Sequence, residues 1–231
     1  MNIAIDIEKV RFNMIEQQIR TWEVLDQDVL DLLSQVKRED FVPAAYRALA
    51  FVDMEIPLAH GAQGAARLQT MMAPKLEARI MQELAIQKHE KVLEIGTGSG
   101  YLTALLAKRA QQVVSVEIFP EFSQVAGRNL QHAGISNAVL EVGDAALAPP
   151  VLMGIQGYDV IVLTGSTPVL PKAFLDALNP GGRLFAVVGD APVMEAMLYT
   201  KTTGGTIAAM EIFETVLTPL INAQQPQRFE F

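Results

Sequence analysis

Residues 91–101 read KVLEIGTGSGY, a short apolar strand pattern that runs directly into three closely spaced glycines. Glycine adopts backbone conformations that other residues avoid, and it lets a ligand approach the main chain. Apolar residues recur at helical spacing after Gly100, so we expect a helix from about that position. The stretch therefore predicts the first strand, the binding loop and the first covering helix of an α/β domain.

Strand and helix patterns alternate after this loop. A helix is expected from Pro120 to about Gly134, a tight turn at residues 179–182, and a hairpin turn around Thr203–Gly205. Apolar strands that alternate with helices are typical of a parallel sheet covered on both faces. The pattern predicts a doubly wound, mostly parallel α/β fold that ends in an antiparallel hairpin. The expected strands cover residues 91–95, 113–117, 138–144, 158–165 and 183–190.

The residues before the loop have a different pattern. Residues 1–75 predict a helical extension and a connector, and residues 76–231 predict the binding domain, the two forming one structural unit. Asp26 or Asp28 can cap an amphipathic helix in the extension, and Pro74 is expected to begin another helix. The connector, residues 51–74, is rich in small residues near its middle, and we expect it to be either the most mobile ordered segment or a lid.

Composition excludes several classes of protein. Half of the residues are apolar, which argues against disorder, and the net charge of −8 comes without a basic stripe, so no nucleic-acid partner is expected. The absence of cysteine excludes disulfide scaffolds and thiol nucleophiles. No apolar run reaches about 18 residues, so we expect no membrane partner and a soluble cytoplasmic protein. No metal site is predicted, and the sequence leaves the oligomeric state open.

Three acidic residues point to the kind of cofactor. Glu117 ends the second strand 21 residues after Gly96 (117 − 96 = 21), near the offset of about 20 residues typical of a carboxylate that binds ribose. The loop lacks the Gly-x-Gly-x-x-Gly spacing for a pyrophosphate, and the charge of Glu94 would repel one but attract an amino group and a sulfonium. Asp144 could accept from an adenine amine or simply form a turn. The pattern favours S-adenosylmethionine over a nicotinamide dinucleotide.

Several of these motifs together resemble one family. The segment EIGTGSGYLTALLA, the strand that ends in Glu117, the GDA at residues 143–145 and the upstream IPL and QTMMAPK segments are similar to those of the protein-L-isoaspartate O-methyltransferases. The resemblance implies a seven-stranded methyltransferase fold, S-adenosylmethionine as methyl donor, damaged aspartyl residues as substrate and a connector that folds over the cofactor. The predicted cofactor-binding residues are Gln69, Thr70, Met71, Glu94, Gly96, Thr97, Gly98, Ser99, Gly100, Tyr101, Glu117, Ile118, Gly143, Asp144, Ala145 and Thr164.

The chain departs from the family pattern on the substrate side. The family segment Thr-Ile-Ser-x-Pro corresponds to residues 70–74, so Thr70 matches and Met72 takes the position of the serine. A thioether cannot donate the hydrogen bond that the hydroxyl supplies to the substrate carboxylate. Thr70 or His60 could provide a replacement donor, although each also fits a purely structural role, and residues 62–68 include an apparent insertion. Thr70 and Met72 are thus the catalytic candidates.

Three functional hypotheses follow. The first is a methyltransferase that modifies a carboxylate in a protein or peptide, or a related small-molecule acceptor. The second is a relative that binds the cofactor but acts on another acceptor, or serves as a sensor or interaction module, because of Met72. A nicotinamide-dependent oxidoreductase is the third, and the missing pyrophosphate motif argues against it.

Overall fold

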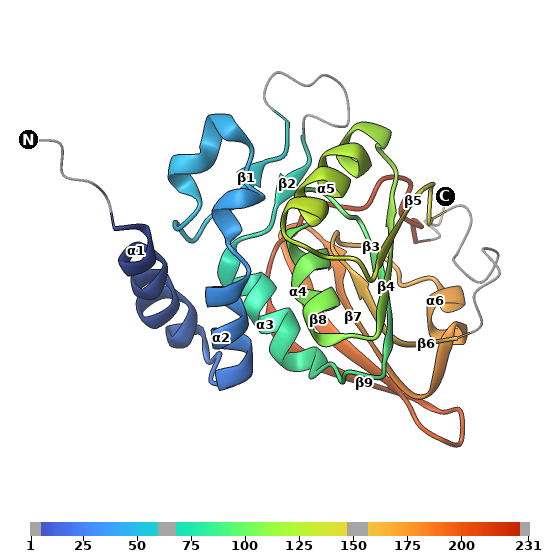
Figure 1. Cartoon of the computed structure of the whole chain (residues 1–231). Coiled ribbons are helices and arrows are strands. Elements are labelled where there is room, and N and C mark those ends of the chain that lie inside the picture. Colours follow the sequence, from blue (N-terminus) through green and yellow to red (C-terminus); the bar gives the residue numbers. More distant parts are fainter. Residues whose placement is uncertain (1–5, 60–67, 147–156, 227–231) are drawn as a thin grey trace, which may run out of the picture.

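A mixed seven-stranded sheet forms the centre of the molecule. The computed structural model describes residues 6–59, 68–146 and 157–226 (Figure 1). The strand order is β5-β4-β3-β6-β7-β8-β9, in which β8 is antiparallel to both of its neighbours and the other pairs are parallel. This arrangement confirms the predicted fold class. The strands are β3 (Lys91–Ile95), β4 (Gln112–Glu117), β5 (Ala138–Val142), β6 (Tyr158–Leu163), β7 (Leu178–Asp190), β8 (Val193–Lys201) and β9 (Ile207–Glu214).

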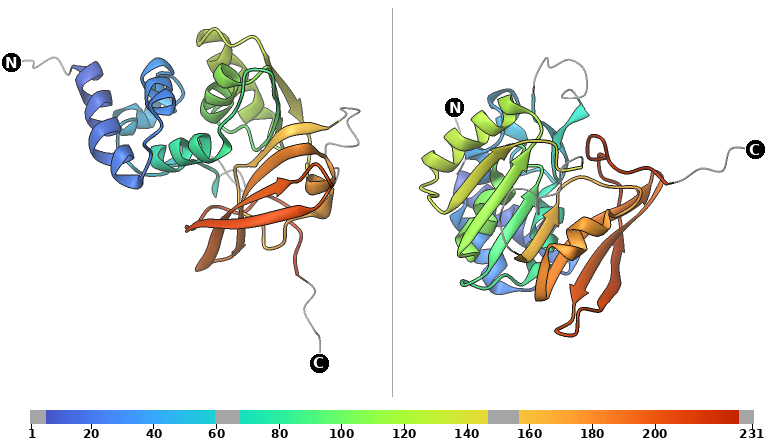
Figure 2. Two further views of the ribbon diagram at one scale, coloured as in Figure 1. Left: turned by 90° about the horizontal axis from the view of Figure 1, so that it is seen from below. Right: turned by 90° about the vertical axis from the view of Figure 1, so that its right-hand side faces the viewer.

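Described helices lie on both faces of the sheet, although only the short α6 lies on the second face. Successive strand residues point to opposite faces, so Val92 belongs to one buried cluster and Leu93 to the other. The first cluster includes residues of α3 (Pro74–Leu84) and α4 (Tyr101–Arg109). The second includes Phe174 of α6 (Lys172–Asp176), on the opposite side of the sheet in Figure 2. The helix α5 (Pro120–His132) contacts β4 and β5 and begins at a proline, as expected.

The N-terminal helices pack on the α3 and α4 side of the sheet (Figures 1 and 2). Asp26 caps α2, because its carboxylate accepts from the Asp28 amide at 2.9 Å. Buried residues of this region share one hydrophobic cluster with α3, α4 and the sheet, so the extension is packed against the domain. Its elements are α1 (Ile7–Met14), the π-helix η1 (Ile15–Ile19), α2 (Gln27–Gln35) and the 3-10 helices η2 (Arg20–Trp22), η3 (Arg38–Asp40) and η4 (Ala44–Leu49).

The described ends of the connector pair with each other. The strands β1 (Ile56–Pro57) and β2 (Thr70–Met71) are antiparallel. Residues 60–67, which include His60 and most of the apparent insertion, lie outside the described residues. The pairing brings Thr70 to the end of the sheet where β3 and β4 finish, next to the start of α3.

The predicted turn at residues 179–182 lies within β7 rather than before it, because this strand begins at Leu178. Gly181 has a positive φ of 85°, and a Cβ on Gly182 would lie 2.9 Å from the Asn179 carbonyl oxygen, so the chain turns sharply at this point. The register with β6 shifts between Tyr158 and Val160, so the extra residues are absorbed as an irregularity of the strand. The hairpin prediction is confirmed, since the Thr202 amide donates to the Thr206 carbonyl oxygen at 2.8 Å between β8 and β9.

Candidate active site

The glycine loop lies between β3 and α4 and is held by the neighbouring strand. Gly96, Gly98 and Gly100 all have positive φ angles, of 96°, 54° and 84°. The Gly98 amide donates to Glu117 Oε2 at 2.8 Å, which ties the loop to the end of β4. These backbone conformations are costly for residues with a Cβ, so the spacing of the glycines follows from the shape of the turn.

Two of the glycines also allow close contacts. A Cβ on Gly96 would lie 2.2 Å from Thr164 Oγ1, a hydroxyl that is 2.9 Å from the Ile95 carbonyl oxygen and 2.8 Å from that of Gly96. Thr164 thus positions the loop through its main chain. A Cβ on Gly100 would lie 3.1 Å from the Cβ of Ala126 in α5, so Gly100 permits helix packing.

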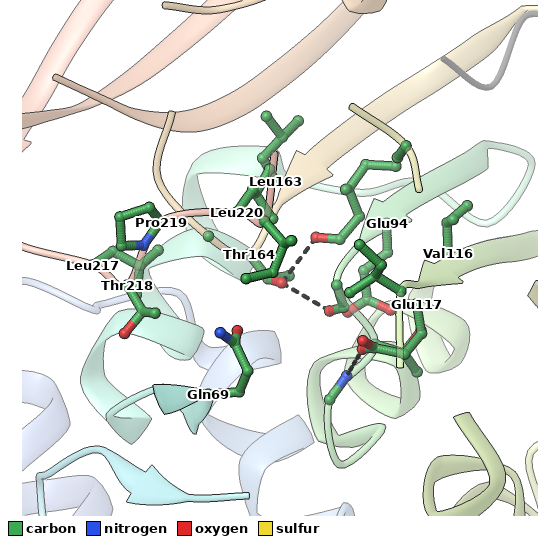
Figure 3. A pocket seen from close by; sticks show the side chains of 18 of the residues that line it. Gln69, Glu94, Val116, Glu117, Leu163, Thr164, Leu217, Thr218, Pro219 and Leu220 are labelled. Atoms are coloured by element: carbon green, nitrogen blue, oxygen red, sulfur yellow. Dashed lines mark hydrogen bonds between the residues drawn. The ribbon is translucent and has the colours of Figure 1, made fainter. Parts of the chain in front are cut away.

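A pocket opens beside this loop. Figure 3 shows Glu94, Glu117 and Thr164 on one side of it, with Gln69 and Thr218 nearby on the other. Among the predicted cofactor residues, only Gly100 does not line the pocket; the structure brings the others together. The connector reaches the same pocket through Thr70, Met71 and Met72. Residues outside the predicted set also line it, among them Leu58, Glu77, Leu102, Phe122, Thr167, Phe174, Leu217, Thr218, Pro219, Leu220, Ile221, Ala223 and Gln224.

Glu94 is fully buried in a chain of hydroxyl groups. Its Oε2 accepts from Thr103 and from Ser115, and the Ser115 hydroxyl accepts in turn from Thr97 at 2.6 Å. Glu94 Oε1 is buried and has no hydrogen-bond partner among the described residues. Burial raises the pKa of Glu94 to about 8, although the two hydroxyl donors lower it. The sequence pattern predicts a charged Glu94, whereas the raised pKa favours the protonated carboxyl at neutral pH unless a cation approaches.

Glu117 is buried at the end of β4. Burial raises the pKa of Glu117, and hydrogen bonds from the backbone amides of the loop and of the following turn oppose that rise. One of those donors, the Phe119 amide, lies 3.0 Å from Oε1. Both oxygens therefore face backbone donors, and their remaining lone pairs are available to hydroxyl groups in the pocket.

Asp144 follows β5 and connects it to the C-terminal segment. Its Oδ1 accepts from the Ala146 amide at 2.9 Å, which is the turn-forming role considered from the sequence. Its Oδ2 accepts from Asn222 Nδ2 at 2.6 Å. Residues 217–224, which follow β9, thereby form part of the pocket wall. No motif marks this segment in the sequence, so its role became visible only in the fold.

Of the connector residues at the family's catalytic positions, Thr70 is bonded to a carboxylate and Met72 is buried in the pocket wall. Thr70 Oγ1 donates to Glu55 Oε2 at 2.9 Å, so its hydrogen is not directed into the pocket. Met72 is 6% exposed and lines the pocket. Glu77, also in the pocket wall, pairs with the buried Arg38 at 3.3 Å. The described residues of the connector therefore offer no free side-chain hydroxyl at the serine position.

Comparison with known proteins supplies the family. The sequence model of the protein-L-isoaspartate(D-aspartate) O-methyltransferases matches residues 9–225. This chain belongs to that family. It is accordingly an S-adenosylmethionine-dependent methyltransferase, and the nicotinamide-dependent alternative does not describe it.

Individual relatives agree with the family assignment of this methyltransferase. It is 37% identical over 194 residues to the protein-L-isoaspartate O-methyltransferase of Methanoculleus marisnigri, covering 84% of each chain. It is 34% identical over 217 residues to that of Aeropyrum pernix, covering 92% of this chain and 80% of the other.

Solved structures support the fold of the methyltransferase. A Plasmodium falciparum chain solved in complex with S-adenosyl-L-homocysteine superimposes with a TM-score of 0.75 at 20% identity, covering 92% of this chain and 98% of that one. A protein-L-isoaspartate O-methyltransferase structure superimposes with a TM-score of 0.70 at 23% identity, covering 92% and 65%. The described residues contain no helix long and apolar enough to cross a membrane, and no group of three or more His, Cys, Asp or Glu side chains placed to hold a metal ion.

Proposed function

We propose that the pocket beside the glycine loop holds S-adenosylmethionine and that the connector presents an isoaspartyl carboxylate of a protein or peptide to it. The observation that carries this proposal is the convergence of the loop, Glu117 and residues 69–72 on one pocket at the carboxyl ends of the parallel strands. Cofactors of doubly wound proteins bind at this end of the sheet.

The residues of the pocket fit such a cofactor. The buried Oε1 of Glu94 has no hydrogen-bond partner among the described residues, and once the carboxyl ionises, the ammonium of an amino-acid moiety would supply one. The remaining lone pairs of Glu117 suit two ribose hydroxyls, and Asp144 suits an amine at the edge of the pocket. Gly96 and Gly98 line the pocket without side chains, so a ligand could approach the main chain of the loop.

When bound, S-adenosylmethionine supplies a methyl group that its sulfonium already activates. An ionised carboxylate is already a nucleophile at neutral pH, because its ordinary pKa is about 4. The residues of this chain therefore need to orient the acceptor and exclude water. The apolar side chains of Met71, Met72 and Leu217 border the pocket and suit the second task.

The test is transfer of a labelled methyl group to a peptide that contains one isoaspartyl residue. The same peptide with an ordinary aspartyl residue is the control. Base-labile label on the isoaspartyl peptide alone is expected, because carboxyl methyl esters hydrolyse in base. Binding of S-adenosylmethionine without transfer to the isoaspartyl peptide would contradict the proposed acceptor.

One observation favours a second candidate function. Met72 cannot donate a hydrogen bond, and the hydroxyl of Thr70 is already bonded to Glu55. A family member that binds the cofactor without methylating isoaspartyl residues would show this pattern. Such a protein would bind S-adenosylmethionine in calorimetry and would leave isoaspartyl peptides unlabelled.

A further inference from the structure

A carboxylate lies directly behind the connector residue that borders the cofactor pocket. Glu55 is half-buried, and its Oε2 accepts the hydroxyl hydrogen of Thr70 at 2.9 Å. Thr70 lines the cofactor pocket, whereas Glu55 lines a second cavity. The hydrogen bond between Thr70 and Glu55 therefore links the two spaces, and it holds an acidic group beside the cofactor pocket.

The second cavity adjoins the first. Leu217, Thr218 and Pro219 line both, so the C-terminal segment forms a wall that they share. The second cavity has a volume of about 520 Å³ and also includes Asp190 at the end of β7. It is large enough for a side chain that flanks the methylated residue of a peptide.

The charges around this cavity have one sign. Glu55 and Asp190 are its charged members, and no Lys, Arg or His belongs to the described residues that line either cavity. Neither carboxylate takes part in an ion pair of the described residues within 4.0 Å. An anionic group placed here would be repelled, whereas a cation would gain from both carboxylates, since complementary charge at an interface sets specificity.

We propose that Glu55 is a specificity-determining residue, which with Asp190 selects acceptor peptides that carry a lysine or arginine next to the methylated isoaspartyl residue. The inference rests on the proposed function and adds the class of peptide that the site accepts. Glu55 acts through its charge, because a glutamine at this position would still accept the hydrogen bond from Thr70.

The experiment compares two isoaspartyl peptides that differ only in the next residue, lysine in one and glutamate in the other. Binding of each fluorescent peptide to the protein saturated with S-adenosylhomocysteine is measured by anisotropy at low salt, and methyl transfer is measured separately. The wild-type protein should bind the lysine peptide about fivefold more tightly or better, and added salt should reduce the preference. The variants Glu55→Gln and Asp190→Asn should each reduce the preference for the lysine peptide. The control Glu211→Gln, at an exposed position on β9, should leave that preference unchanged.

The outcomes separate this inference from the proposed function. Equal binding of both peptides, tighter binding of the glutamate peptide, or binding of neither would overturn the inference. An unchanged preference in Glu55→Gln would also overturn it. A lysine preference in binding without methyl transfer to either peptide would support the charge selection and refute isoaspartyl methylation. Equal binding of both peptides with methyl transfer to both would refute the charge selection and support isoaspartyl methylation.

Discussion

Arg38 Nη2 donates a hydrogen bond of 2.8 Å to the main-chain carbonyl oxygen of Met72, the residue at the serine position of the family. The same guanidinium donates to the Ala50 carbonyl oxygen at 2.8 Å and pairs with Glu77. Arg38 is 1% exposed and Glu77 is 2% exposed. The N-terminal extension therefore reaches under the connector and holds its backbone beside the pocket.

Replacing Arg38 should destabilise the fold strongly. In Arg38→Met, Glu77 loses its buried partner, and breaking such a pair typically costs about 3–5 kcal/mol. Burial already raises the pKa of Glu77 to about 7 despite the opposing effect of Arg38. Urea unfolding at pH 8 measures the effect.

The matched control for this prediction is the double variant Arg38→Met with Glu77→Gln. It removes the uncompensated charge, so it should recover part of the lost free energy of unfolding. An exposed ion pair is worth less than about 1 kcal/mol. If Arg38→Met lowers the free energy of unfolding by no more than that, Arg38 and Glu77 do not act as a buried pair.

The affinity for S-adenosylmethionine should rise with pH because of Glu94. Its pKa is raised to about 8, so the carboxyl is mostly protonated at pH 6 and ionised at pH 9. A cationic ligand favours the ionised form, so binding should release a proton and strengthen by up to about tenfold per pH unit below pH 8. Calorimetry in buffers of different ionisation enthalpy measures both the affinity and the proton release.

Glu94→Gln is the control, because the amide oxygen still accepts from Thr103 and Ser115. Its affinity should be weaker at pH 9 and show less dependence on pH. The raised pKa also affects the stability of the ligand-free protein. Because the pKa of Glu94 is higher in the folded than in the unfolded state, its contribution to the free energy of unfolding is complete below about pH 4.5 and is lost as the pH rises to about 8. If the affinity for S-adenosylmethionine depends equally on pH in the wild type and in Glu94→Gln, Glu94 is not the group that titrates on binding.

Gly96→Ala should damage the loop more than Gly134→Ala damages its turn. Both glycines have positive φ, of 96° and 67°, so each substitution carries backbone strain of about 1–2 kcal/mol. Only at Gly96 would the new Cβ meet a close neighbour, at 2.2 Å, whereas nothing lies within 4 Å at Gly134. Thermal unfolding and calorimetry with S-adenosylmethionine should show that Gly96→Ala alone loses affinity. If both variants bind S-adenosylmethionine with equal affinity, the contact between a Cβ at residue 96 and Thr164 does not disturb the binding loop.

Met72→Ser should raise isoaspartyl methylation. The hydroxyl restores a donor to the acceptor carboxylate, and a hydrogen bond to a charged group is worth about 1.5–3 kcal/mol, or about ten- to a hundredfold in kcat/KM. Met72→Ala is the matched control, since it removes the buried thioether without adding a donor. Both variants should lose stability from the cavity that they leave. If Met72→Ala gains as much activity as Met72→Ser, the hydrogen-bond explanation is wrong.

Much of the cofactor side was predictable from local sequence. Gly96, Gly98 and Glu117 meet in the structure as their spacing predicts, because a parallel strand, a turn and the next strand bring fixed sequence offsets to one edge of a sheet. Gly100 was grouped with them, but it lies outside the pocket lining and permits packing against Ala126. Sequence spacing alone cannot distinguish a glycine that approaches a ligand from one that approaches a helix.

By itself, the sequence determined the class of fold, the position of the binding loop and the family, since these depend on short-range periodicity and on motifs that are contiguous in the chain. Only the tertiary structure decided that burial raises the pKa of Glu94 and that the Thr70 hydroxyl is bonded to Glu55. It also decided that Arg38 donates to the Met72 carbonyl oxygen and that the segment after β9 lines the pocket. Each of these depends on burial or on contacts between distant segments. Desolvation and long-range contacts arise from packing, so neither leaves a local pattern in the sequence.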